Sequence, residues 1–285
     1  MPGFEPMSVG GIIDNAFRLY KRNFLRFIAI VAIVQVPMSL LMIFAQSLMT
    51  VGGQGLSQGR GPQVAMFLGG SAAMIVAGLF GIVAGNLSKA ALVKSVSESY
   101  LGEEVTVREA YRYVLPKLLT IILASILVGL IAGAGLLLCV VPGVIFMLWF
   151  ALTVQAIVIE GQGVTAAMTR SKELVKGNMG KVFLVGLILF LIGLLLGGVG
   201  GGAGAAVRLV LGLPQGGQGP GAIAGVAISQ LFSLIANVLG APIGGAAMIL
   251  LYYDLRIRKE GFDLEMLAQQ FGGKGAASNA ADYEQ

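Results

Sequence analysis

Residues 118–159 read LLTIILASILVGLIAGAGLLLCVVPGVIFMLWFALTVQAIVI, without one charged side chain. A helix needs about 20 mostly apolar residues to cross the hydrocarbon layer of a membrane. This stretch is about two span lengths long, more than a single helix could accommodate by tilting. Its turn chemistry lies at Pro142 and Gly143, and proline suits the first turn of a returning helix. We therefore expect two membrane spans joined by a tight hairpin at Pro142 and Gly143.

Similar apolar runs, each bounded by charge or by turn residues, occur before and after this stretch. On an insertion scale, each Leu, Ile, Phe or Val contributes about −0.3 to −0.6 kcal/mol, so a few polar side chains do not prevent insertion. Together with the hairpin, these runs predict six transmembrane helices. Their approximate ranges are 27–48, 64–87, 118–138, 141–159, 182–199 and 223–251.

The composition supports a membrane protein. Of the 285 residues, 56% are hydrophobic and 12% are charged, whereas soluble domains average about 25% charged residues. A water-soluble domain of this size could not bury so much apolar surface. We therefore predict an all-α polytopic membrane protein, with residues 1–271 as a single integral membrane domain. The small-residue segment 272–285 is typical of a disordered cytoplasmic tail.

The chain has no histidine and one cysteine, Cys139. A histidine general base, a histidine-activated nucleophile and an imidazole-bound metal are therefore excluded. A single cysteine likewise excludes an intramolecular disulfide and a cysteine-rich metal site. We expect no catalytic residue, no metal and no cofactor.

The basic residues gather in alternating connections between the predicted spans. Of the 19 lysines and arginines, only Arg60 and Arg208 fall in the other connections. Because cytoplasmic loops carry an excess of basic residues, both termini are expected in the cytoplasm, and the protein in the inner membrane of a bacterium. The net charge of +5 is therefore interpreted as a topology signal, and nucleic acid is not expected as a partner.

Three segments that precede predicted hairpins, residues 8–22, 106–115 and 164–175, carry apolar side chains at helical spacing with charged residues opposite. They are expected to be amphipathic interfacial helices. A short shared pattern suggests three copies of an interfacial helix plus hairpin, beginning near residues 8, 105 and 163. Chance, or the ordinary occurrence of such helices beside spans, would give the same pattern.

Glycines spaced four residues apart recur in the spans and would let helices approach closely, within one chain or in a dimer. We favour packing within the chain. The pairs are Gly81 with Gly85, Gly129 with Gly133, Gly193 with Gly197, and Gly240 with Gly244.

A basic surface beside the amphipathic segments is the candidate functional site. Lysine and arginine held at headgroup depth attract anionic lipid, at about 1 kcal/mol each. The alternative is that these residues only set the orientation and pair with Asp254 and Glu260. The candidate residues are Arg18, Lys21, Arg22, Arg170, Lys172, Arg256 and Arg258.

Segments 8–24, 141–143, 160–161, 169–177 and 252–264 resemble the bacterial glycerophosphoryl diester phosphodiesterase membrane-domain family. In some members, this membrane part is joined to a soluble, metal-dependent catalytic domain that uses histidines. Because this chain has no histidine, the resemblance implies a stand-alone membrane domain without that activity. The motif residues of interest are Pro142, Gly143, Glu160, Tyr252, Tyr253, Asp254 and Glu260.

Three functions are compatible with these features. We favour a non-catalytic membrane protein that organises anionic lipid, or a membrane or cytoplasmic protein partner, through its basic helices. A small transporter or transporter subunit is the second, because amides such as Asn86, Gln155, Gln230 and Asn237 lie in the spans near Pro242. A membrane enzyme of lipid metabolism is the third, although no acid–base or nucleophile constellation is recognisable. The sequence does not define an oligomeric state.

Overall fold

The computed structural model describes residues 6–58, 61–213 and 220–260, and in these ranges its regular structure is helical. Six segments are long and apolar enough to cross a membrane, which confirms the all-α polytopic architecture. The predicted tail, 272–285, lies outside the described residues. The six segments are Phe24–Gly52, Val64–Leu101, Val107–Leu138, Val140–Glu160, Met179–Val210 and Gly221–Glu260.

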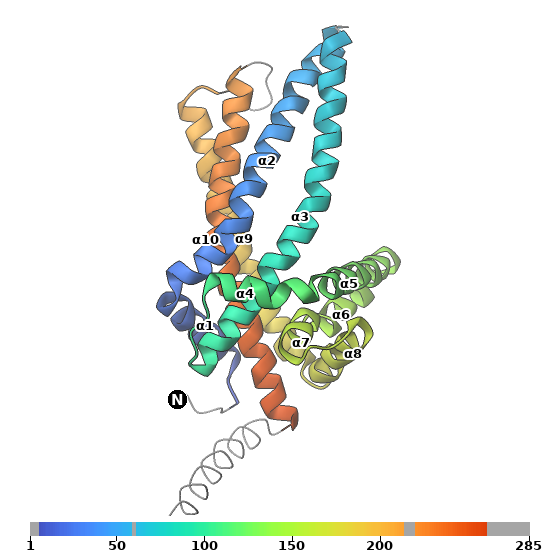
Figure 1. Ribbon diagram of the computed structural model, residues 1–285, viewed down its shortest axis with the longest axis vertical. Helices are drawn as coiled ribbons and strands as arrows, with labels where there is room; N and C mark the ends of the chain where they lie inside the picture. The colour runs from blue at the N-terminus through green and yellow to red at the C-terminus, as the bar shows by residue number, and fades with distance from the viewer. Residues whose placement is uncertain (1–5, 59–60, 214–219, 261–285) are drawn as a thin grey trace, which may run out of the picture.

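Four long helices run side by side along the long axis of the molecule (Figure 1). They are α2 (Phe24–Gln58), α3 (Gly61–Leu101), α9 (Met179–Val210) and α10 (Pro220–Glu260). At 1.5 Å per residue, the 41 residues of α3 or of α10 extend about 60 Å. Because the hydrocarbon layer is about 30 Å thick, these helices continue well beyond it.

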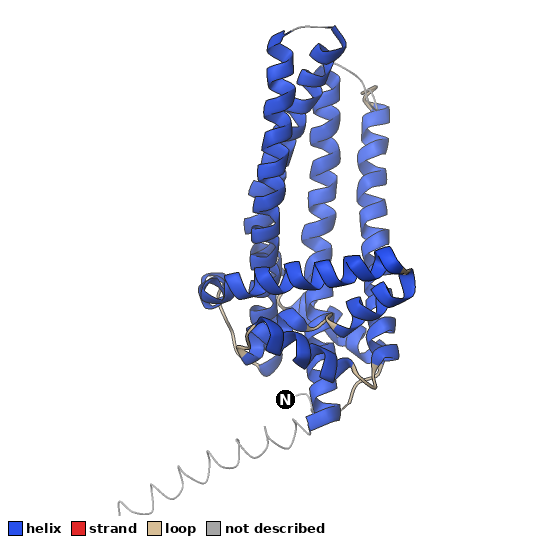
Figure 2. Ribbon diagram, turned by 90° about the vertical axis from the view of Figure 1, so that its right-hand side faces the viewer, coloured by secondary structure: helices blue, strands red, loops and turns tan. Residues whose placement is uncertain are grey.

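The apolar stretch 118–159 forms a hairpin that lies across the four long helices. Its first arm is α5 (Leu118–Leu138), and its second is α6 (Val140–Trp149) followed by α7 (Thr153–Glu160). Figures 1 and 2 both show α5 and α6 at a large angle to the bundle axis. This second hairpin is therefore oriented differently from the α2–α3 and α9–α10 hairpins.

The chain reverses at Cys139, which has extended backbone angles (φ −169°, ψ 148°), and α6 begins at Val140. The reversal therefore lies between the predicted spans 118–138 and 141–159, three residues before the predicted turn at Pro142. Pro142 lies in the first turn of the returning helix, as expected, so the reversal has to precede it. Gly143 serves close packing instead, because a Cβ atom there would lie 2.5 Å from Cγ of Leu136 on α5.

A short helix precedes each hairpin: α1 (Val9–Arg22), α4 (Val107–Val114) and α8 (Val164–Val175). A short 3-10 turn, η1 (Leu115–Lys117), joins α4 to α5. α1 begins at Ser8, whose hydroxyl accepts a hydrogen bond from the backbone of Gly11, and α4 begins with a capping box. The order of a short helix followed by a hairpin therefore occurs three times along the chain.

Most of the paired glycines do not make the close helix contacts that were expected. A Cβ atom at Gly129, Gly133, Gly193 or Gly197 would meet no heavy atom within 4 Å. A GxxxG pair brings helices together only when a partner faces it. Among the paired glycines, a Cβ atom at Gly240 would lie 2.9 Å from Leu196. Other tight contacts lie outside the pairs, at Gly52, Gly70, Gly135, Gly200 and Gly245.

The largest concentration of buried side chains lies at the end of the bundle where the short helices gather. α10 contacts α1, α2, α3, α8 and α9, and is therefore the central helix of this region. Tyr252 and Tyr253 on α10, Ile12 on α1 and Phe27 on α2 are among its fully buried side chains. This packing fixes the last turns of α10, which carry the charged residues described next.

Candidate functional site

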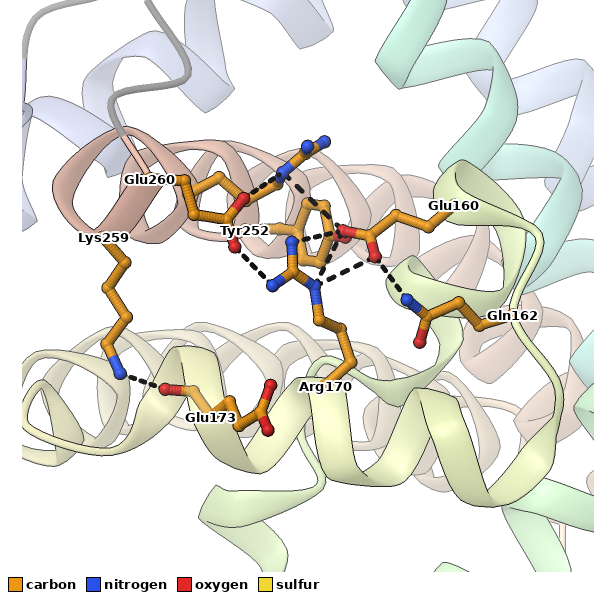
Figure 3. Close-up of polar contacts among 8 residues, drawn as sticks. Glu160, Gln162, Arg170, Glu173, Tyr252, Lys259 and Glu260 are labelled. Atoms are coloured by element: carbon orange, nitrogen blue, oxygen red, sulfur yellow. Dashed lines mark hydrogen bonds and ion pairs between the residues drawn. The ribbon is translucent and has the colours of Figure 1, made fainter.

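Charged and polar side chains from three helices meet beside the last turns of α10 (Figure 3). Glu160 ends α7, Arg170 projects from the middle of α8, and the remaining members lie on α10. We call this set the glutamate–arginine network. It consists of Glu160, Arg170, Tyr252, Arg256 and Glu260.

Glu160 is the acceptor at the centre of this network. Nε of Arg170 donates to both carboxylate oxygens at 3.1 and 3.0 Å, and its Nη2 donates to Oε1 at 3.1 Å. The hydroxyl of Tyr252 donates to the same carboxylate, and Nε2 of Gln162 donates to Oε2 at 2.8 Å. Donors from α8, from α10 and from the loop after α7 thus converge on one carboxylate.

Glu260 provides the second carboxylate of the network. It forms an ion pair with Nη1 of Arg170 and accepts from Nε of Arg256 at 3.2 Å. The hydrogen bonds that Arg170 donates to Glu260 and to Glu160 raise the pKa of Arg170, so its guanidinium stays charged. Because this side chain is only 20% exposed, salt screens its ion pairs less than it screens surface pairs.

A second charged centre lies around Asp254, whose side chain is fully buried. Oδ1 accepts from the backbone N–H of Met7 at 2.7 Å, and Oδ2 accepts from Nε of Arg258 at 3.0 Å and from Nζ of Lys181. Lys181 and Arg258 also donate to the carbonyl of Met7. The Asp254 centre thus ties the segment before α1 to α9 and α10.

The other motif residues have packing roles. Tyr253 shares a 2.6 Å hydrogen bond with Ser97 of α3, and its ring stacks on Tyr100 at a centroid distance of 5.5 Å. Pro142 and Gly143 lie in the α5–α6 hairpin. The structure therefore brings Glu160, Tyr252 and Glu260 together, and keeps Pro142 and Gly143 in a separate element.

The seven basic candidates do not form one surface. Arg170, Arg256 and Arg258 are occupied by the carboxylates of the two charged centres. Lys172 lies with Nζ 4.5 Å from the ring centroid of Trp149, a cation–π contact. The alternative interpretation of Arg256 and Arg258, pairing with Glu260 and Asp254, is what the structure shows.

The candidates on α1 are more accessible. Arg18 is 75% exposed and pairs with Asp14 at 2.8 Å, and Lys21 is exposed next to it on the helix surface. Arg22 donates to the backbone carbonyl of Ser99 at 2.8 Å and links α1 to α3. Exposed basic residues of the other short helices are Arg108 and Arg112 on α4, Lys172 on α8, and Lys176 directly after α8.

Sequence reasoning missed Lys181 and a three-residue stack at the base of the α5–α6 hairpin. In that stack, Nζ of Lys94 and Nζ of Lys117 each lie 4.1 Å from the ring centroid of Tyr113. A carboxylate on a buried helix, such as Asp254, requires a cation beside it. This requirement could have indicated Lys181, which is the last charged residue before the apolar part of α9.

The fold and these two centres define an all-helical multi-pass membrane protein in which buried and partly buried ion pairs join α7, α8 and α9 to α10. Residues 7–252 match the family described as Domain of unknown function (DUF7847), and the chain belongs to that family. No curated protein and no solved structure matches the chain.

Proposed function

We propose that this protein is a non-catalytic protein of the bacterial inner membrane that organises anionic lipid at its cytoplasmic face. The supporting observation is the exposed pair Arg18 and Lys21 on α1, close in sequence to Leu25, which is 80% exposed at the start of α2. A basic helix followed by exposed apolar side chains suits the boundary between headgroups and acyl chains. A protein with an acidic surface is the other partner that this pair would attract.

The arrangement of the chain ends supports the cytoplasmic location of both termini. Met7 bonds to Asp254, so the start of α1 and the last turns of α10 lie at the same end of the bundle. This end also carries most of the basic residues, as the positive-inside rule requires of a cytoplasmic end.

We also propose that the chain is related to glycerophosphoryl diester phosphodiesterase membrane domains, and the contacts of the motif residues Glu160, Tyr252 and Glu260 support this proposal. These motif residues join α7, α8 and α10 through hydrogen bonds and ion pairs. A motif that maintains the fold in this way is expected in a membrane domain with or without an attached catalytic domain.

The exposed residues, rather than Arg256 and Arg258, are the ones to test. The double variant Arg18→Gln/Lys21→Gln should retain less phosphatidylglycerol than the wild type after purification in the same detergent. In the wild type, retention should fall as NaCl is raised, because screening weakens the attraction between exposed charges. Mass spectrometry of the co-purified lipid gives the measurement.

The charge-preserving variant Arg18→Lys/Lys21→Arg is the matched control and should retain lipid like the wild type. If the glutamine variant retains as much anionic lipid as the wild type and the charge-preserving variant, with the same salt dependence, α1 is not the lipid-binding surface. Crosslinking of the same variants in cells tests the protein partner, which should be lost from the glutamine variant alone.

A further inference from the structure

The α5–α6 hairpin leaves the bundle as a separate apolar arm. Its two helices pack closely, because a Cβ atom at Gly135 would lie 2.9 Å from Cα of Gly143. Ser125 on α5 donates to Asn86 on α3 at 2.7 Å, which fixes where the hairpin crosses the bundle. Beyond this crossing, Leu137 and Leu138 near the tip are 91% and 85% exposed.

The crossing point gives the depth of the hairpin. Asn86 precedes Lys89 by three residues on α3, which corresponds to about 4.5 Å along a helix. Lys89 is exposed, and a lysine at a span end directs its ammonium group toward the headgroups. Because α5 lies across the bundle (Figures 1 and 2), it keeps this shallow depth along its length.

The surface of the hairpin matches hydrocarbon and not water. Residues 118–159 include no charged side chain. A helix that is apolar on all sides requires a protein core or a bilayer around it, and the outer turns of α5 and the start of α6 are exposed. The large exposed side chains on this arm include Leu119, Leu123, Ile126, Leu130, Leu136, Val140, Val141 and Met147.

We propose that the α5–α6 hairpin is embedded in a single leaflet, in the plane of the membrane, with lipid acyl chains covering its exposed sides. The leaflet is the one next to α1, α4 and α8. In this arrangement α5, which is about 32 Å long, lies parallel to the membrane plane. Its depth below the headgroups is about 5–10 Å, which is typical of interfacial helices. The hairpin thus takes up area in one leaflet only, as a wedge does.

Loop charges do not distinguish this arrangement from a hairpin that crosses the membrane. In both cases the chain returns to its starting side, so α4 and α8 remain on the same side. The position of the tip differs. A crossing hairpin places Cys139 at the far surface, whereas an in-plane hairpin keeps it among acyl chains on the near side.

The native protein contains the probe for this difference, because Cys139 is its single cysteine and is exposed at the tip. Intact spheroplasts and inside-out vesicles are treated with a membrane-impermeant maleimide, and parallel samples with permeant N-ethylmaleimide. We expect background labelling of Cys139 by both maleimides while the membrane is intact, because a thiol among acyl chains does not form the reactive thiolate, and full labelling once a mild detergent dissolves the bilayer. A fluorophore on Cys139 should be quenched more by nitroxide lipids labelled near the headgroup than by those labelled at the chain end.

Two variants calibrate the reagents. Cys139→Ser/Leu211→Cys places a cysteine at the end of α9 and should react from outside, whereas Cys139→Ser/Glu103→Cys, between α3 and α4, should react from inside. Labelling of Cys139 from outside at the level of the Leu211→Cys variant would show a crossing hairpin and overturn the proposal. Labelling from inside at the level of the Glu103→Cys variant would place the tip in water, and protection that persists in mild detergent until the protein is denatured would place it in protein. Either result also overturns the proposal.

Discussion

Glu160 illustrates how a single side chain joins parts of the chain that are distant in sequence. It ends α7, yet its carboxylate receives Arg170 of α8 and Tyr252 of α10. The two arginines nearest to it, Arg170 and Arg256, have Glu260 as their other carboxylate partner. The network therefore depends on the negative charge at position 160.

Replacing this carboxylate by an amide tests that dependence. Glu160→Gln keeps the shape but removes the negative charge that pairs with Arg170 and Arg256, so we expect the free energy of unfolding to fall by about 1.5–3 kcal/mol. Thermal unfolding in a mild detergent gives the measurement. Glu173→Gln, at an exposed glutamate on the neighbouring helix α8, is the control and should unfold like the wild type. Equal stability of both variants would contradict a supporting role for Glu160.

Asp254 should contribute more to stability than Glu160, because its side chain is fully buried. Asp254→Asn leaves Lys181 and Arg258 without their carboxylate, and losing one member of a buried ion pair costs about 3–5 kcal/mol. Amide hydrogen exchange should also become faster just before α1, since the N–H of Met7 exchanges a charged carboxylate acceptor for a weaker neutral amide oxygen. Asp14→Asn, which removes an exposed ion pair with Arg18, should change stability by no more than about 1 kcal/mol. Similar behaviour of the two variants would refute the role of Asp254.

At the scale of elements, the sequence predicts helices better than it predicts where they turn and point. Apolar runs of spanning length identify all six apolar segments, because hydrophobicity and length are local properties. The reversal at Cys139 has no turn chemistry of its own, whereas Pro142 and Gly143 do, so the sequence indicates the wrong residues. The orientation of α5 depends on contacts such as Ser125 with Asn86, 39 residues apart, which local patterns do not encode.

The same limit applies to the site. Spacing of four residues already indicates that Arg256 can pair with Glu260 and Arg258 with Asp254 on one helix face, as the structure shows. Tyr252 and Glu160 are 92 residues apart, and their contact follows only from the packing of α7 against the bundle. Motif resemblance selects both residues but does not pair them.

The contact between the arms of the α5–α6 hairpin can be tested with two glycines. Gly143→Ala should reduce the free energy of unfolding by about 1–3 kcal/mol and so lower the midpoint of thermal unfolding. The reason is that the new Cβ atom would collide with the backbone and side chain of Leu136. Gly133→Ala on α5 meets no atom within 4 Å and should be neutral or stabilising through its higher helix propensity. If Gly143→Ala were as stable as Gly133→Ala, the arms would not be packed as closely as described.

At the scale of the whole molecule, two classes of charge occupy one end of the bundle. The carboxylates of Asp254 and Glu160 lie inside, where neighbouring cations bind them and join α7, α8, α9 and α10. The side chains of Arg18 and Lys21 lie outside, where solvent and ions reach them. The first class supports the fold, and the second remains available for a ligand.

These two classes should respond differently to salt. Raising NaCl from about 0.1 M to 1 M shortens the Debye length from about 10 Å to about 3 Å, which screens exposed charges but affects buried pairs much less. We expect the wild type to lose most of its co-purified anionic lipid over this range, while the thermal midpoint of protein already stripped of lipid stays nearly constant. Measuring both quantities on the same preparations separates binding from folding. A midpoint that falls with salt in stripped protein would mean that the ion pairs around Glu160 and Asp254 are exposed to solvent, contrary to their burial in the structure.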